Sequence, residues 1–146
     1  MKYKLTDVKI NFMGKTLFQI EAVKCFGDIV KGQKGGFIEK ESNLSQGGGN
    51  AWVYGDAKVY GDAKVSGNAE VYGNADYLVI GPIGSRNDIT TFFKTANNDI
   101  KVSCGCFTGT IEEFLEKVNE THGNNNYAKE YKTAVEIAKI HIFGGE

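Results

Sequence analysis

The chain has 146 residues, of which 41% are hydrophobic and 24% are charged, and its formal net charge at neutral pH is −1. A chain of this size folds as one ordinary domain or two small modules, and its charge balance argues against binding to nucleic acid polymers or anionic membranes. The sequence contains no apolar run of about 18 residues, the length that crosses a bilayer, and its N-terminus alternates polar with apolar residues. We therefore expect a cytoplasmic protein with no membrane partner.

The cysteine and histidine residues lack the spacing of a metal site. The cysteines are Cys25, Cys104 and Cys106, and the last two are spaced to share one face of a strand, which disfavours a disulfide between them. Adding His122 and His141 produces no recognisable set of zinc ligands. The sequence predicts reduced thiols, no metal and no cofactor.

Residues 2–30 are predicted to form β structure. Two segments rich in strand-forming residues, KLTDVKINF and TLFQIEAVKCF, flank a turn candidate at Met13 to Lys15. An open end of a β-helix exposes unpaired strand groups, so we expect this segment to cap a solenoid that begins farther along the chain.

A six-residue unit repeats five times between Gly49 and Leu78: GNAWVY, GDAKVY, GDAKVS, GNAEVY and GNADYL. Each Gly-Asn or Gly-Asp pair supplies a corner, and the valines and alanines are expected to point inward. The units resemble the hexapeptide motif of left-handed parallel β-helices, in which three short strands form one coil. Ile38 and Leu44 extend the spacing upstream, and an insertion at 46–49 absorbs their shift in phase. We predict about two coils, within a first domain of residues 1–78.

The period stops after Asp76, and a second domain is predicted over residues 79–146. Residues 91–94 and 100–104 are expected to pair as strands across a turn at 96–99. The segment SCGCFTGT at 103–110 follows these strands, and the first helix is expected directly after it.

Two helices are expected at the end of this domain. Thr110 and Glu113 have the spacing of a capping box, and apolar residues follow at helical spacing until Gly123. A last helix at about residues 127–142 carries an apolar face that should pack on the sheet. The predicted fold class is therefore mainly β plus α+β: a short left-handed parallel β-helix of hexapeptide repeats, followed by a small ββαα module.

Arg86 is the strongest candidate for binding an anion. It is the only arginine among 17 basic residues, and it lies in the loop GPIGSRND. A guanidinium donates paired hydrogen bonds to phosphate or carboxylate, and the neighbouring Gly84, Ser85 and Asn87 let backbone donors approach an anion. The alternative is an ion pair with Asp88 or a nearby glutamate.

Two further segments carry candidate ligand contacts. Phe107 lies just before the capped helix, so it could stack on a base while the first-turn amides hold a phosphate; alternatively it belongs to the core. His122 and the three asparagines at 124–126 connect the helices, where asparagine either forms a turn or contacts the edge of a purine.

Catalysis is not expected. Hexapeptide acyltransferases use a histidine near a coil, and the repeats contain none. The related carbonic anhydrases need three histidines for their metal, and the whole chain has two. No spacing argues for a base beside Cys104 or Cys106.

The segments GPIGSRNDITTFFKT, CGCFTGTIEEF and THGNNNYAKEY resemble the core of the Thoeris anti-defence family of phage proteins. The resemblance implies a sponge that sequesters the cyclic ADP-ribose messengers made by bacterial TIR-domain enzymes, and in some members cyclic oligonucleotides, without cleaving them. The segment FGDIVKGQKGGFIEKESNLS and the repeats are similar to a module found in phage and prophage proteins. The expected location is thus the cytoplasm of the bacterial host.

The same resemblance places individual residues of this chain on the ligand. It implies Arg86 and Asn87 on phosphate or ribose, Phe107 or Phe114 stacked on the base, and Asn124 on adenine or ribose. It also implies dimers of the binding module, whereas β-helices usually form trimers, so a hexamer would satisfy both. The alternatives are a structural or oligomerisation β-helix protein of a phage particle, and a relative of the hexapeptide acyltransferases.

Overall fold

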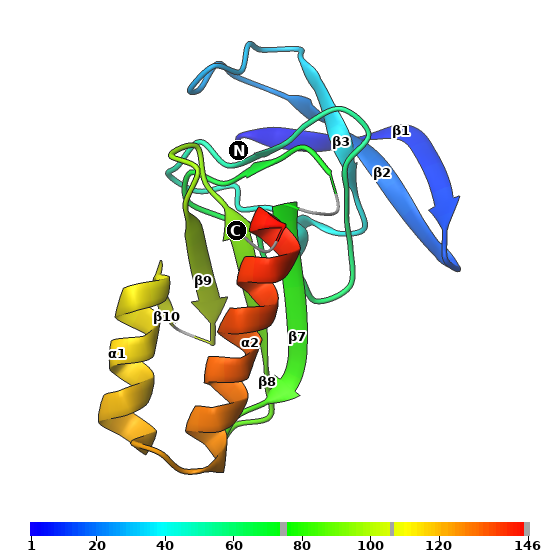
Figure 1. Ribbon diagram of the computed structural model, residues 1–146. Coiled ribbons are helices and arrows are strands. Elements are labelled where there is room, and N and C mark those ends of the chain that lie inside the picture. The colour runs from blue at the N-terminus through cyan, green and yellow to red at the C-terminus, as the bar shows by residue number, and fades with distance from the viewer. Residues whose placement is uncertain (74–75, 106, 145–146) are drawn as a thin grey trace. The chain divides into compact units, whose positions relative to one another are not determined.

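A computed structural model describes residues 1–73, 76–105 and 107–144 of the chain. The chain forms two compact units, Met1–Asn74 and Ala75–Glu146, and each is described in turn (Figure 1). The predicted domain boundary, between residues 78 and 79, lies inside the first strand of the second unit. Within the described residues, neither helix combines the length and the apolar character needed to cross a membrane.

The first unit begins with an antiparallel hairpin. Strands β1 (Tyr3–Phe12) and β2 (Lys15–Ala22) are joined by a two-residue turn, in which Met13 and Gly14 have φ angles of 52° and 79°. Two positive φ angles match the twist of the turn to that of the strands, which confirms the predicted turn. Strand β3 (Lys34–Ile38) pairs antiparallel with β2 and is the third strand of the first sheet.

In the described residues 49–73, the hexapeptide repeats form three strands of two residues each. Their valines and alanines are buried as predicted, with at most 4% of any of these residues exposed: Val53, Val59, Val65 and Val71, and Ala51, Ala57, Ala63 and Ala69. The strands are β4 (Trp52–Val53), β5 (Lys58–Val59) and β6 (Glu70–Val71). Strand β5 pairs parallel with β3, and β4 pairs parallel with β6. A short 3-10 helix, η1 (Glu41–Asn43), precedes an isolated parallel bridge between Leu44 and Val65.

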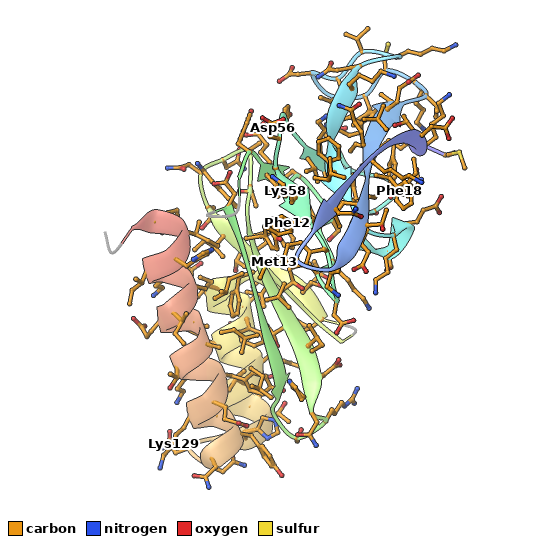
Figure 2. All side chains as sticks on the ribbon, turned by 90° about the vertical axis from the view of Figure 1, so that its right-hand side faces the viewer. Phe12, Met13, Phe18, Asp56, Lys58 and Lys129 are labelled. Atoms are coloured by element: carbon orange, nitrogen blue, oxygen red, sulfur yellow. The ribbon has the colours of Figure 1, made fainter. Side chains whose placement is uncertain are left out.

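Close backbone approach explains two glycines of β3. A Cβ atom on Gly35 would lie 2.6 Å from the carbonyl oxygen of Val53 and 2.7 Å from the Trp52 ring, and one on Gly36 would lie 2.5 Å from the carbonyl oxygen of Ala57. A larger residue at either position would push the repeats away from β3. A cation–π contact also lies in the first unit. The Lys58 ammonium lies 5.3 Å from the centre of the Phe12 ring (Figure 2).

The predicted fold class is wrong. Among the described residues, parallel pairing is confined to the two-residue contacts of the repeats and the single bridge, while the long strands pair antiparallel. A six-residue unit leaves only two strand residues between corners, whereas the longer segments pair with their chain neighbours through tight turns. The chain is therefore an α+β protein and not a left-handed parallel β-helix with a ββαα module. The trimer expected from a solenoid stays a prediction.

The second unit is a four-stranded antiparallel sheet with two helices. The sheet order is β10-β9-β8-β7, formed by β7 (Tyr77–Ile83), β8 (Asp88–Lys94), β9 (Ile100–Cys104) and β10 (Phe107–Thr110). Helices α1 (Ile111–His122) and α2 (Asn126–Phe143) cover one face of this sheet (Figure 1). Side chains from β8, β9 and both helices make the core: Phe92, Ile100, Val102, Phe114, Val118, Ala128, Tyr131, Ala134, Val135 and Ala138.

The local predictions for the second unit are partly confirmed. The hairpin of β8 and β9, the capping box and the two helices are present, with Thr110 Oγ1 accepting from the Glu113 amide at 3.1 Å. The prediction of two strands is wrong, because β7 and β10 also join the sheet. The turns that join β7 to β8 and β9 to β10 lie beside the two helices, and a cleft is found there.

Candidate functional site

A cleft of about 370 Å³ lies within the second unit, between the turns at one end of the sheet and the two helices. The β7–β8 and β9–β10 turns line one side, and α1 and α2 line the other. A volume of this size is typical of small-molecule sites. The lining residues are Ser85, Arg86, Asp88, Cys104, Gly105, Phe107, Phe114, Lys117, Val118, Thr121, His122 and Tyr131.

Aromatic rings form a continuous wall of the cleft. The Phe114 ring lies 5.6 Å from that of Phe107 and 5.4 Å from that of Tyr131, and the His122 ring lies 6.1 Å from Tyr131, nearly parallel to it. Phe114 and Tyr131 are buried, whereas Phe107 and His122 are partly exposed. The buried pair thus fixes the two outer rings, which offer flat surfaces to a ligand.

Gly84 fixes the position of the β7–β8 turn. Its φ angle is +79°, and a Cβ atom there would lie 1.8 Å from the hydroxyl oxygen of Tyr131, so only glycine fits. The amide of Gly84 also donates to the Glu130 carboxylate at 3.0 Å. The turn is therefore held against α2, and it presents the exposed Ser85 and Arg86 to the cleft.

Two cations of the cleft have no anionic partner in the part of the chain that the structure describes. Neither the Arg86 guanidinium nor the Lys117 ammonium lies in an ion pair or hydrogen bond with a described residue. The alternative ion pair between Arg86 and Asp88 is not formed. Because no carboxylate of the described residues pairs with them, both cations are available to an anion that enters the cleft.

Tyr131 lines the cleft, and its hydroxyl is a hydrogen-bond donor. Burial raises the pKa of Tyr131, and the neighbouring Cys104 and the charge of Asp88 raise it further. The phenol therefore remains protonated at neutral pH. The Cys104 sulfur accepts a hydrogen bond from the Thr90 hydroxyl at 3.3 Å, which ties this thiol to the sheet.

The structure brings three of the five predicted site residues together. Arg86, Phe107 and Phe114 all line the cleft, although Phe114 is also a core residue with 4% of its surface exposed. Asn87 is not a lining residue; it has a φ angle of 49° and shapes the turn. Asn124 lies in the connection between the helices, where its side-chain oxygen accepts from the Lys132 ammonium at 3.3 Å.

The phosphate contact expected at the start of α1 stays a prediction, and two backbone amides there already have partners within the chain. The Glu113 amide donates to Thr110 Oγ1, and the Thr110 amide donates to the Glu113 carboxylate at 2.9 Å. Glu112 and Glu113 also place two negative charges in the first turn, which would repel a phosphate. The cleft instead follows the second half of α1.

Lys117 and Thr121 were not predicted as site residues, and His122 was placed in the connection between the helices. Together with Phe114 and Val118, these residues are spaced three and four apart on one face of α1. Lys117 and Thr121 are both exposed, and a lysine or threonine beside the apolar face of a helix is an ordinary surface residue, so the sequence alone did not set them apart.

A second hollow of about 480 Å³ lies on another face of α2, beside β7. It is larger but more open, and half of its lining residues are aliphatic, among them Ile80, Ile83 and Ile137. Its charged residues, Lys129 and Glu130, are both exposed. The first cleft is the better candidate, because it combines unpaired cations, hydrogen-bonding groups and aromatic rings.

Comparisons with known proteins supply no assignment, since neither the family models nor the curated proteins match this chain. Within the described residues, no group of three or more histidine, cysteine, aspartate or glutamate side chains is placed to hold a metal ion.

Proposed function

We propose that the cleft of the second unit binds a nucleotide messenger and retains it chemically unchanged. The observation that carries the proposal is the unpaired Arg86 guanidinium beside a wall of aromatic rings. A phosphate pairs with the guanidinium, and a base stacks on an aromatic face. Lys117 provides a second positive charge, and Ser85, Tyr131 and His122 provide hydrogen-bonding groups.

Local binding rather than overall attraction fits the charge of the chain. The net charge is −1, so the summed field does not concentrate anions at the surface. Recognition of a phosphate must then come from the few cations that face the cleft. This favours a small ligand that enters the cleft over a polymer that lies across the molecule.

The messenger class follows from the resemblance to the Thoeris anti-defence family. In the proposed role, a phage-encoded protein in the cytoplasm of the bacterial host captures cyclic ADP-ribose isomers, and possible further ligands are cyclic oligonucleotides. Capture prevents these messengers from reaching the effector of the host defence. Such a sponge needs tight binding, slow release and abundance, but no turnover.

The first experiment identifies what the protein retains. The protein is incubated with cyclic ADP-ribose isomers and with cyclic di-AMP, separated from free ligand and heated, and the released compound is analysed by mass spectrometry. A sponge returns the ligand unaltered. A modified product would identify an enzyme, and the absence of any retained ligand would favour a structural role.

The Arg86→Ala variant tests the observation on which the proposal depends. Loss of a charge-assisted hydrogen bond should weaken binding by about 1.5 to 3 kcal/mol, which is about tenfold to a hundredfold. Folding should change little, because the side chain is exposed. The matched control is Lys129→Ala, which removes one positive charge from α2 outside the cleft (Figure 2). Equal affinities for Arg86→Ala and the wild type, measured by titration calorimetry, would remove Arg86 from the site.

A further inference from the structure

Asp88 places a hydrogen-bond acceptor in the cleft. One carboxylate oxygen accepts from the amide of Ile89 at 2.8 Å. The other faces Gly105, where a Cβ atom would lie 3.0 Å from it, so glycine leaves room around this oxygen. In the described part of the chain, Asp88 has no ion pair, even though Arg86 and Lys117 line the same cleft.

A carboxylate is an unfavourable neighbour for a simple anion. It repels phosphate, and it weakens the attraction of the two cations for one. An ionised carboxylate accepts hydrogen bonds and donates none. Asp88 therefore favours a ligand in which a hydrogen-bond donor lies close to the ligand's own negative charge.

The position of Asp88 in the chain indicates which donor this is. Asp88 follows Arg86 by two residues, so their Cα atoms are at most about 7 Å apart. A phosphate on Arg86 thus leaves Asp88 beside the groups that adjoin the phosphate, which in a nucleotide belong to the sugar. The 2′-hydroxyl of ribose is a donor in this position, and acidic residues bind ribose hydroxyls in other nucleotide sites.

We infer that Asp88 accepts a hydrogen bond from the 2′-hydroxyl of the bound nucleotide, and that the cleft thereby selects ribonucleotides over their 2′-deoxy analogues and over inorganic pyrophosphate. This inference rests on the proposed function, because it specifies the ligand of the same cleft. The 2′-hydroxyl is free and adjoins the phosphate in 3′,3′-cyclic di-AMP. In cyclic ADP-ribose the phosphates are on the 5′ carbons, and the selection applies to those isomers that are not closed through the 2′ oxygen.

The Asp88→Asn variant tests this inference with little change in shape. The Ile89 amide keeps the single oxygen of the asparagine side chain as its acceptor, so the NH2 group faces the cleft. A donor then replaces the acceptor that the 2′-hydroxyl requires. The matched control is Asp99→Asn, because Asp99 accepts from the Ile100 amide at the same 2.8 Å but lies outside the cleft.

The measurement is the affinity for cyclic ADP-ribose and cyclic di-AMP, each compared with its 2′-deoxy analogue and with pyrophosphate. We expect the wild type and Asp99→Asn to bind at least one ribonucleotide about tenfold to a hundredfold more tightly than its deoxy analogue. In Asp88→Asn this ratio should approach one, while binding of pyrophosphate stays constant or increases. Unfolding temperatures of the variants show that both remain folded.

Three results would overturn the inference, and they are separable from a failure of the proposed function. Equal binding of ribonucleotide and deoxy analogue by the wild type would remove the selection and leave the nucleotide site in place. If Asp88→Asn retains the wild-type ratio, the selection and the nucleotide site remain, but a group other than Asp88 makes the selection. No binding of any nucleotide by the wild type would overturn the proposed function and this inference together.

Discussion

The ammonium group of Lys2 lies inside the first unit, where only 2% of the residue is exposed. It donates to the carbonyl oxygen of Ala51 at 2.9 Å and lies 5.0 Å from the centre of the Phe26 ring. Burial, with a smaller contribution from the charge of Lys24, lowers the pKa of Lys2 to about 8. A buried lysine with this pKa makes the stability of the first unit depend on pH.

The free energy of unfolding should rise between about pH 8 and about pH 10. In this interval the unfolded chain holds a proton on Lys2 that the folded chain releases, because the pKa falls from 10.5 to about 8 on folding. Stability therefore increases with pH, by roughly 1 kcal/mol once solvent screening is allowed for. Burial raises the pKa of Tyr3, which opposes this trend only at higher pH.

Chemical denaturation of the Lys2→Met variant measures this contribution. The rise that depends on Lys2 should disappear in the variant, which has an apolar side chain of similar length at the same position. Lys9→Met is the control, because Lys9 is exposed and should leave the pH dependence as it is in the wild type. A rise of the same size in Lys2→Met would show that another group titrates.

Among the elements, α1 depends most directly on a local hydrogen-bonding motif. Thr110→Ala removes the side-chain acceptor of the Glu113 amide and should lower the free energy of unfolding by about 0.5 to 2 kcal/mol. Ligand affinity should fall much less, because the cleft follows the second half of α1. The comparison is with Thr108→Ala, which changes an exposed threonine of β10. Equal destabilisation by both variants in urea titrations would assign the loss to β10 and not to the cap.

The elements that the sequence predicted correctly are those whose signals lie close together in the chain. Thr110 and Glu113 begin α1, and Met13 and Gly14 turn the first hairpin, because each motif is completed within a few residues. Strands β7 and β10 were missed since β7 contains Pro82 and β10 has only four residues. Their pairing depends on β8 and β9, which no local pattern reveals.

The residues of the candidate site also could be predicted only where their signals lie close together in the sequence. Arg86 and Phe107 were identifiable from a single arginine and from an aromatic residue beside glycines. Lys117 and Asp88 were not, because a lysine on a helix and an aspartate beside a turn are ordinarily solvent-exposed residues. Only the packing of α1 against the turns brings them into one cleft. Asn124 does not line the cleft and lies in the connection between the helices, where asparagine commonly forms a turn.

At the scale of the whole molecule, the division into two units separates the hexapeptide repeats from the cleft. Each unit has buried side chains of its own: Trp52 and Leu44 belong to the first, and Phe92 and Val135 to the second. The expected dimer or hexamer stays a prediction, which sedimentation analysis can address. Separate cores also allow the units to unfold separately, and the chain contains a probe for each.

Trp52 is the only tryptophan, so its fluorescence reports on the first unit, whereas both described α-helices lie in the second unit and give its circular dichroism signal. Leu44→Ala removes a fully buried side chain and should destabilise the first unit by about 2 to 5 kcal/mol. We expect its fluorescence transition to shift to lower denaturant while the helical transition stays in place. Val135→Ala should produce the reverse pattern, since Val135 is buried between the helices and the sheet. A common shift of both signals in either variant would show that the two units unfold as one, because a single cooperative transition moves every probe together.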